Sequence, residues 1–135
     1  IAAALALGGD IACMGTRFIA TPESGVVEGH RTMIPTVGAD DIVASAAMNG
    51  VPAHWMRQSI EAVGLDPKSL PAVRSPMPDG VKPWRAIWSA GQSVGLIEKV
   101  EPVADLVARL TREFEALPSI PDWRARMVGI SGDWA

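Results

Sequence analysis

The clearest pattern in the chain is an apolar stripe over residues 102–117. Apolar residues recur there every three or four positions, at Val103, Leu106, Val107, Leu110, Phe114 and Leu117. Charged residues lie between them, which is typical of an amphipathic helix with one buried face. Pro102 suits the first turn of such a helix, and Pro118 ends it. The pattern therefore predicts a helix over 102–117.

The first fourteen residues predict a short helix followed by a buried strand. Residues 1–7 are helix formers, and Gly8-Gly9 stops them. Residues 10–14 (Asp-Ile-Ala-Cys-Met) are short, mostly apolar and bounded by glycines, which is typical of a buried strand. A helix, a glycine turn and a buried strand form the αβ half of a βαβ unit.

The amino-terminal segment also indicates a longer polypeptide. No methionine initiates it, and nothing caps the first N–H groups of the helix at 1–7. A single buried strand also lacks partners for its backbone N–H and C=O groups. We therefore expect a protein whose preceding strands complete a sheet. The alternative is a processed chain with a frayed first helix.

Shorter patterns alternate with breaks over residues 21–64. Thr21-Pro22 predicts a helix start, with the helix running to about Thr36, and Gly38–Asp41 predicts a break. Residues 42–44 fit either a short strand or a helical turn. A turn at Asn49-Gly50 precedes a second predicted helix over 52–63. One face of that helix carries Trp55, Met56, Ser59, Ile60 and Val63.

The next segment predicts a long loop and one more helix. Five prolines lie within residues 66–83, and this density forbids regular structure. Residues 84–97 predict a helix in which Trp84 and Trp88 are core anchors. The small residues over 89–95 favour close packing of another helix, and approach of a ligand is the alternative.

Composition excludes several classes of protein. With 135 residues, 48% of them hydrophobic and 20% charged, the chain is an ordinary globular sequence of one-domain length. The formal net charge of -3 disfavours a nucleic-acid binder. One cysteine excludes an internal disulfide framework and a Cys-rich zinc site. No apolar run approaches the roughly 20 residues of a membrane span, and the apolar start lacks the basic residues of a signal peptide. We therefore expect a cytoplasmic protein.

The strongest candidate for chemistry is Gly15-Thr16, directly after the predicted strand. Glycine there lets backbone N–H groups approach an anion, and Thr16 adds a hydroxyl donor. A phosphate cradle and an ordinary tight turn both fit. His30 and His54 share no motif; we expect His30 on an exposed helix face. We expect Cys13 to be inert, buried packing.

Several stretches together resemble the C-terminal portion of nitronate monooxygenases, formerly called 2-nitropropane dioxygenases. They are residues 3–8, 14–18, 20–24, 82–84, 87–92 and 94–97. The resemblance implies an α/β fold, a (β/α)₈ TIM barrel that binds FMN. Such barrels need about 250 residues, so this chain would supply the last strand and the helices after it. Residues 1–117 would be the C-terminal part of the barrel, mostly helical, and 118–135 a tail.

The resemblance also implies where the cofactor binds. Family members hold the FMN phosphate with backbone groups after the last two strands, and the final-strand part corresponds to Cys13, Met14, Gly15 and Thr16. Cys13 stands where the family often has glutamine. A Gly-Gly turn that forms the other half of the site, and the catalytic histidine, are expected before Ile1. We assign no catalytic residue and no metal ligand to this chain.

The implied reaction is oxidation of an alkyl nitronate by O₂ through reduced flavin, giving a carbonyl compound and nitrite. The partners would be this small substrate and O₂, with no nucleic acid and no membrane; a homo-oligomer is compatible with the resemblance. A flavin-dependent enoyl-thioester reductase on the same barrel is one alternative, and a non-catalytic helical binding module is another. Residues 1–135 alone are expected to be poorly soluble and inactive.

Overall fold

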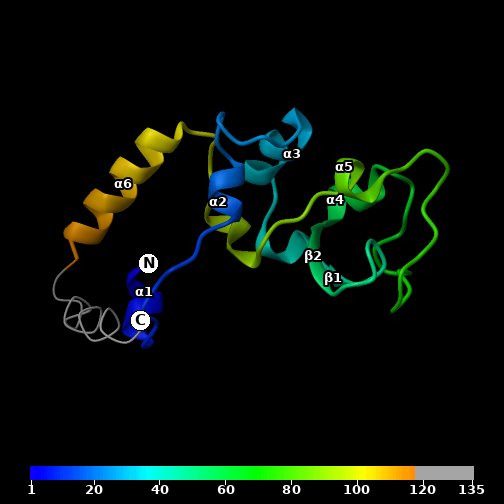
Figure 1. Ribbon diagram of the computed structural model, residues 1–135, viewed down its shortest axis with the longest axis horizontal. Helices are drawn as coiled ribbons and strands as arrows, with labels where there is room; N and C mark the ends of the chain where they lie inside the picture. Colours follow the sequence, from blue (N-terminus) through cyan, green and yellow to red (C-terminus); the bar gives the residue numbers. More distant parts are fainter. Residues whose placement is uncertain (118–135) are drawn as a thin grey trace, which may run out of the picture. The chain divides into compact units, whose positions relative to one another are not determined.

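The computed structural model describes residues 1–117 in two compact units (Figure 1). Of the described residues, the first unit contains 1–14 and 103–117, and the second contains Gly15–Pro102. The predicted tail at 118–135 lies outside the described residues. None of the helices in residues 1–117 combines the length and the apolar character that crossing a bilayer requires.

The first unit contains the two helices that the apolar patterns predict. They are α1 (Ala2–Ala6) and α6 (Val103–Glu115). Leu106 on α6 is fully buried, as its place in the apolar stripe predicts, and an Arg109–Glu113 ion pair of 3.0 Å lies along the same helix. A cavity of about 210 Å³ in this unit is lined by Ile1, Ala2, Leu110, Glu113, Phe114 and Leu117.

The predicted strand at 10–14 is wrong. These residues form neither strand nor helix, Ile11 is 71% exposed, and Cys13 is exposed rather than buried. A strand is stable only where a neighbour pairs with its backbone N–H and C=O groups, and no segment of the described residues pairs with this one. The local apolar pattern was therefore insufficient to predict a strand.

The second unit begins with short helices. They are α2 (Thr16–Ile19), α3 (Glu28–Met33), η1 (Ile34–Thr36) and η2 (Ala39–Asp41). The helix expected over 21–36 exists only from residue 28. Over 21–27 side chains compete with a helical backbone: Thr21 Oγ1 donates to the Phe18 carbonyl at 2.9 Å, and Ser24 Oγ to the Ile19 carbonyl at 2.8 Å.

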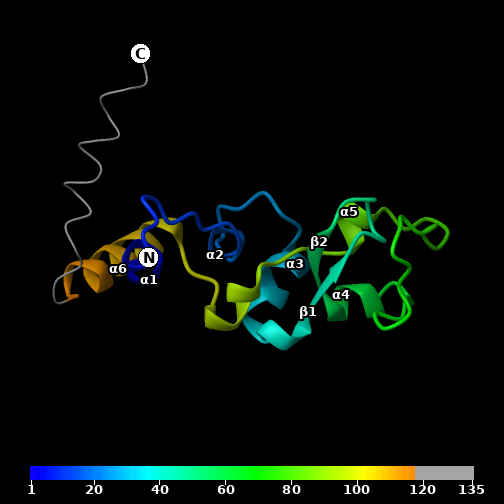
Figure 2. The same ribbon diagram turned by 90° about the horizontal axis from the view of Figure 1, so that it is seen from below.

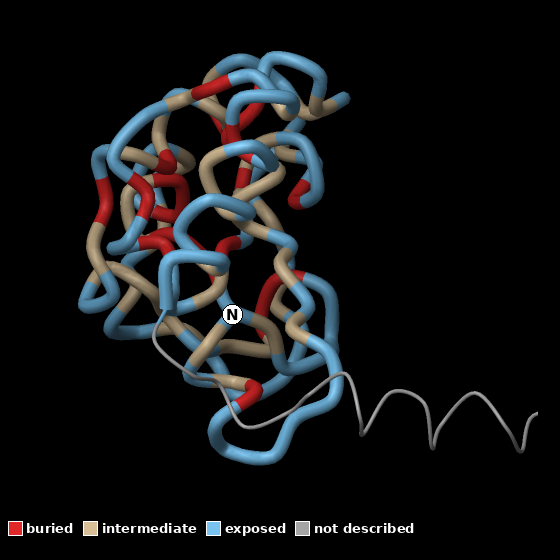
Figure 3. The backbone as a smooth tube through the Cα atoms, turned by 90° about the vertical axis from the view of Figure 1, so that its left-hand side faces the viewer, coloured by how far each residue is buried: buried red, intermediate tan, exposed pale blue. Residues whose placement is uncertain are grey.

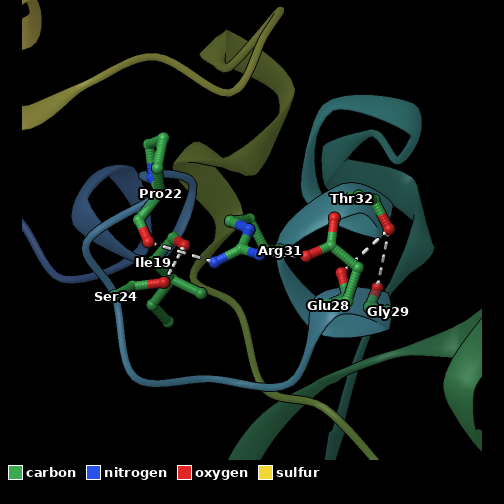
Figure 4. A network of polar contacts seen from close by, with 7 residues as sticks. All are labelled: Ile19, Pro22, Ser24, Glu28, Gly29, Arg31 and Thr32. Carbon is green, nitrogen blue, oxygen red and sulfur yellow. Dashed lines mark hydrogen bonds and ion pairs between the residues drawn. The ribbon is translucent and has the colours of Figure 1, made fainter.

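Polar contacts connect this turn to α3 (Figure 4). Arg31 on α3 donates to the Pro22 carbonyl at 3.3 Å and forms an ion pair with Glu28 one turn away. Thr32 Oγ1 donates to the Glu28 carbonyl at 2.9 Å. Pro22 therefore serves as an anchor for the turn rather than as the first residue of a helix.

A two-stranded antiparallel sheet follows, formed by β1 (Ile42–Ser45) and β2 (Ala53–Met56) (Figure 2). Ile42 pairs with Met56 and Ser45 with Ala53. Residues 42–44, for which a strand and a helical turn were both open, therefore form a strand. The helix expected over 52–63 is wrong at 53–56 and is replaced by β2 and α4 (Arg57–Glu61).

The proline-rich segment is irregular over 66–82, as predicted, and ends at α5 (Pro83–Ala86). The helix expected over 84–97 is wrong: the chain is extended after Ala86, and only η3 (Gln92–Leu96) follows. Ser89 forms an isolated antiparallel bridge with Trp55, and the Met56 N–H donates to the Trp88 carbonyl at 2.8 Å. Pairing with β2 therefore overrides helix formation here.

The core of the second unit consists of two apolar clusters, and the buried residues are red in Figure 3. One contains Ala20, Ile34, Val37, Met56, Ala90, Val94 and Ile97. The other contains Ala47, Met48, Trp55, Ile60 and Ile87. Trp88 is half-buried against the first cluster, whereas Trp84 is 72% exposed, so its predicted role as a core anchor is wrong.

Candidate functional site

Gly15 and Thr16, the predicted phosphate-binding residues, lie at the start of α2. Gly15 caps the helix; its carbonyl accepts bonds from the N–H groups of Phe18 at 3.0 Å and Ile19 at 3.3 Å. Apart from the adjacent residues, no atom of the described chain lies within 4 Å of the place a Cβ at Gly15 would occupy. Within residues 1–117, the N–H groups of Thr16 and Arg17 have no hydrogen-bond acceptor. The turn therefore presents two unpaired N–H donors beside open space, a combination that suits an anion.

The Thr16 side chain contacts a segment far along the chain. The Gly91 N–H donates to Thr16 Oγ1 at 2.8 Å across 75 residues. The hydroxyl also carries one proton, and no described residue accepts a bond from it. Thr16 is therefore an acceptor toward Gly91 and has a free O–H to donate.

Arg17 adds a second link between α2 and η3. Its guanidinium donates to the Leu96 carbonyl at 2.8 Å. The contacts of Thr16 and Arg17 together fasten the start of α2 to both ends of the segment 91–96.

Cys13 and Met14 precede this turn in the chain but belong to the other compact unit. Cys13 is exposed and Met14 is half-buried. Their predicted role beside Gly15 and Thr16 stays a prediction.

His30 is buried, only 8% exposed, which corrects the expectation of an exposed helix face. Its Nε2 lies 2.9 Å from the Ser89 carbonyl, and its ring stacks on the Trp88 indole at a centroid distance of 5.8 Å. Burial lowers the pKa of His30, and the bond to the Ser89 carbonyl opposes that shift. The imidazole is therefore held neutral, and its Nε2–H donates to Ser89.

The sequence did carry a signal for this burial. His30 lies four residues before Ile34 and seven before Val37, the spacing of one helical face, and both apolar residues are buried. His54, by contrast, is exposed on β2. Among the described residues, no group of His, Cys, Asp and Glu side chains could hold a metal ion.

The second unit also contains a cavity of about 360 Å³. Its lining is Val43, Ala44, Ser45, Ala46, Pro52, Pro67, Leu70, Pro71 and Ala72. Ser45 is its one polar side chain, and no acid or base in the lining could activate its hydroxyl as a nucleophile. The chemistry that the described residues offer is therefore concentrated at the start of α2.

Comparison with known proteins gives consistent matches. A family model described as nitronate monooxygenase matches residues 1–113. The chain is 35% identical, over 128 residues, to a nitronate monooxygenase from Paraburkholderia phytofirmans, in an alignment that covers 85% of this chain. The chain spans about a third (34%) of the length of that relative.

Two solved structures of FabK from Thermotoga maritima are also similar. One matches with a TM-score of 0.60 and 30% identity, over 84% of this chain and 40% of that one. A mutant of the same protein matches with a TM-score of 0.58 and 28% identity, over 84% of this chain and 36% of that one. The family match over residues 1–113 includes both Thr16 and Gly91.

Proposed function

The chain belongs to the nitronate monooxygenase family, and on that premise we propose that residues 1–117 are the C-terminal part of an FMN-binding (β/α)₈ barrel. The complete protein would oxidise an alkyl nitronate with O₂ to a carbonyl compound and nitrite. Support comes from the length comparison, because the chain spans about a third of its relative, and a barrel needs about 250 residues. The unpaired segment 10–14 would find strand partners in such a barrel.

Within this proposal, the start of α2 holds the FMN phosphate. Three features fit that group: the unpaired N–H groups of Thr16 and Arg17, the open space over Gly15, and the free proton of the Thr16 hydroxyl. Charge-assisted hydrogen bonds from such donors are the strong ones. Cys13 and Met14, the two residues before the turn in the sequence, are proposed as further cofactor-binding residues because the family resemblance implies it. When bound, FMN would supply the redox chemistry.

The residues of this chain would bind and orient the cofactor rather than transfer a proton. His30 is enclosed by Trp88 and the Ser89 carbonyl, and His54 is exposed on β2. Neither is assigned as a catalytic residue. The catalytic histidine of the family is expected before Ile1.

One observation carries the proposal. The family match covers residues 1–113, and the fold joins two of its separate stretches through the Thr16–Gly91 and Arg17–Leu96 hydrogen bonds. These two contacts, across 75 and 79 residues, hold the turn with the unpaired N–H groups against the segment 91–96 and so support the proposed phosphate site.

The test is flavin content and turnover of the full-length protein. We expect bound FMN, and nitrite release when an alkyl nitronate is supplied in air. Gly15→Val should lower FMN retention, since the side chain would fill the space over the turn. Gly25→Val is the matched control, because nothing lies within 4 Å of a Cβ there either. A full-length protein that neither contains nor takes up FMN would overturn the proposal and favour a non-catalytic module.

An FMN-dependent enoyl-thioester reductase is the second candidate. The solved structures that resemble this chain carry a different name from its curated relative, so a shared fold does not by itself select the reaction. Consumption of NAD(P)H with an enoyl thioester, without nitrite release from a nitronate, would select this candidate instead.

A further inference from the structure

The segment Trp88–Gly91 is held from two sides before it reaches Thr16. The Trp88 N–H donates to Ser59 Oγ at 2.9 Å, and the Trp88 carbonyl accepts from the Met56 N–H at 2.8 Å. Ser59 is buried, and its own hydroxyl donates to the Met56 carbonyl at 2.7 Å. The start of the segment is thus fixed to β2 and α4, with each of these polar groups paired.

His30 on α3 holds the middle of the same segment. Its Nε2–H donates to the Ser89 carbonyl at 2.9 Å. The ring stacks on the Trp88 indole with an angle of 7° between the two planes. Two residues later the Gly91 N–H reaches Thr16. Between these two contacts the Ala90 N–H donates to the His54 carbonyl at 3.3 Å, so His30 is the side chain, beside this backbone bond, that holds the segment before the Gly91 donor.

The Gly91 contact determines what Thr16 offers a ligand. A hydroxyl has one proton and two lone pairs, and here the Gly91 N–H occupies one lone pair. The Thr16 proton then points to a different acceptor, and polarisation by the Gly91 N–H strengthens that donation. If Gly91 moved away, Thr16 would rotate freely and its proton would find other partners.

We infer that His30 is a positioning residue for cofactor phosphate: by holding Ser89 and Trp88 it keeps the Gly91 N–H on Thr16 Oγ1, so that the Thr16 proton is directed at a phosphate oxygen. This inference rests on the proposed function. The inference predicts that His30 affects binding of the phosphate group and not of the flavin ring. The reason is that His30 supports the Gly91–Thr16 hydrogen bond, and Thr16 is the proposed phosphate-binding residue.

The test compares binding of FMN with binding of riboflavin, which has the same ring system and no phosphate. The flavin is removed from the full-length protein, and the dissociation constants of both ligands are measured by fluorescence. In His30→Leu, which removes the donor and keeps an apolar side chain, FMN affinity should fall roughly three- to tenfold, the loss typical of one hydrogen bond. Riboflavin affinity should not change. His30→Gln places an amide N–H near the former Nε2 and should restore FMN affinity.

Thr16→Val separates the inference from the proposed function. If the unaltered protein binds FMN no better than riboflavin, or binds neither, the proposed function fails and the inference with it. If Thr16→Val loses the preference for FMN but His30→Leu keeps it, the phosphate site stands and the role of His30 is overturned. Equal weakening of both ligands in His30→Leu would show a merely structural role, which also overturns it.

A second pair covers the case in which His30→Leu fails to fold. His30→Asn and His30→Gln both carry an amide, but the shorter Asn side chain does not reach the Ser89 carbonyl. We expect His30→Gln to keep the preference for FMN and His30→Asn to lose it. The same preference in both variants would overturn the inference.

Discussion

The imidazole of His30 lies parallel to the indole of Trp88, with 5.8 Å between the ring centroids and 7° between the planes. The Trp88 Nε1–H donates to the Arg85 carbonyl at 2.9 Å, so the indole is fixed at its edge as well as on its face. The helix α3 and the segment 87–91 are joined by this stack. A substitution on the side of α3 that faces Trp88 should therefore displace the segment 87–91, which contacts Thr16.

Gly29→Ala is the first such change. A Cβ at Gly29 would lie 2.5 Å from Cη2 of Trp88, and the rigid indole would have to leave its stack and its Arg85 bond. Alanine favours a helix over glycine by about 1 kcal/mol, but overpacking costs about 1–3 kcal/mol, so we expect a net loss. Urea unfolding of the full-length protein would measure it. Gly25→Ala meets no atom within 4 Å and is the control; equal stability of both variants would contradict the predicted clash.

The pH dependence of stability should report His30. Burial, the larger cause, lowers its pKa in the folded state below the ordinary value of 6.5. As pH falls below about 6.5 the unfolded chain binds the proton first, so stability falls until the folded pKa is reached. Above that window the contribution is fully present. We expect unfolding midpoints between pH 7.5 and pH 5 to fall more for the unaltered protein than for His30→Gln, which has no titratable ring. Parallel curves for the two proteins would refute this.

Long and strongly periodic patterns predicted structure well in this chain. The stripe at 102–117 contains α6, and Leu106 of the stripe is fully buried, although Val107 and Leu117 are exposed. The proline density at 66–82 also excluded regular structure as expected. The patterns at 53–56 and 87–91 were mistaken for helix because their apolar residues also fit a sheet, and pairing between distant segments decided between the two. The strand predicted at 10–14 was wrong for the opposite reason: the segment has a strand pattern, but no described segment pairs with it.

The candidate site was predictable in part. The motif at Gly15-Thr16 was visible in the sequence, and the family to which it pointed is confirmed. The support from Gly91 was invisible, because a backbone N–H has no signature in a sequence and the contact spans 75 residues. His30 was misplaced because the turn at 21–27 was interpreted as the start of its helix, although Ile34 shares its buried face.

Ser59→Ala should destabilise the protein although it removes a single oxygen. The buried hydroxyl accepts from the Trp88 N–H and donates to the Met56 carbonyl, so its loss leaves a backbone donor without its partner. An unsatisfied buried group costs about 1–3 kcal/mol. Ser69→Ala is the control: its hydroxyl donates to Asp66 Oδ2 at 2.7 Å, but both residues are exposed and water replaces the bond. Chemical unfolding should separate the two variants, and similar midpoints would argue against the Ser59 bridge.

Gly91 offers the most direct change to the contact on Thr16. Its backbone angles, φ -76° and ψ 164°, are open to proline, and Gly91→Pro removes the N–H and puts the ring Cδ in its place, which pushes Thr16 Oγ1 away. Gly91→Ala keeps the N–H, and its Cβ would lie 3.4 Å from Thr16 Oγ1, an ordinary contact. Because the Thr16 proton is directed only when Gly91 donates, the proline variant should lose the preference for FMN over riboflavin and the alanine variant should keep it. Titration of both flavins into the two apoproteins checks this, and an unchanged preference in the proline variant would mean that Thr16 binds the phosphate without help from Gly91.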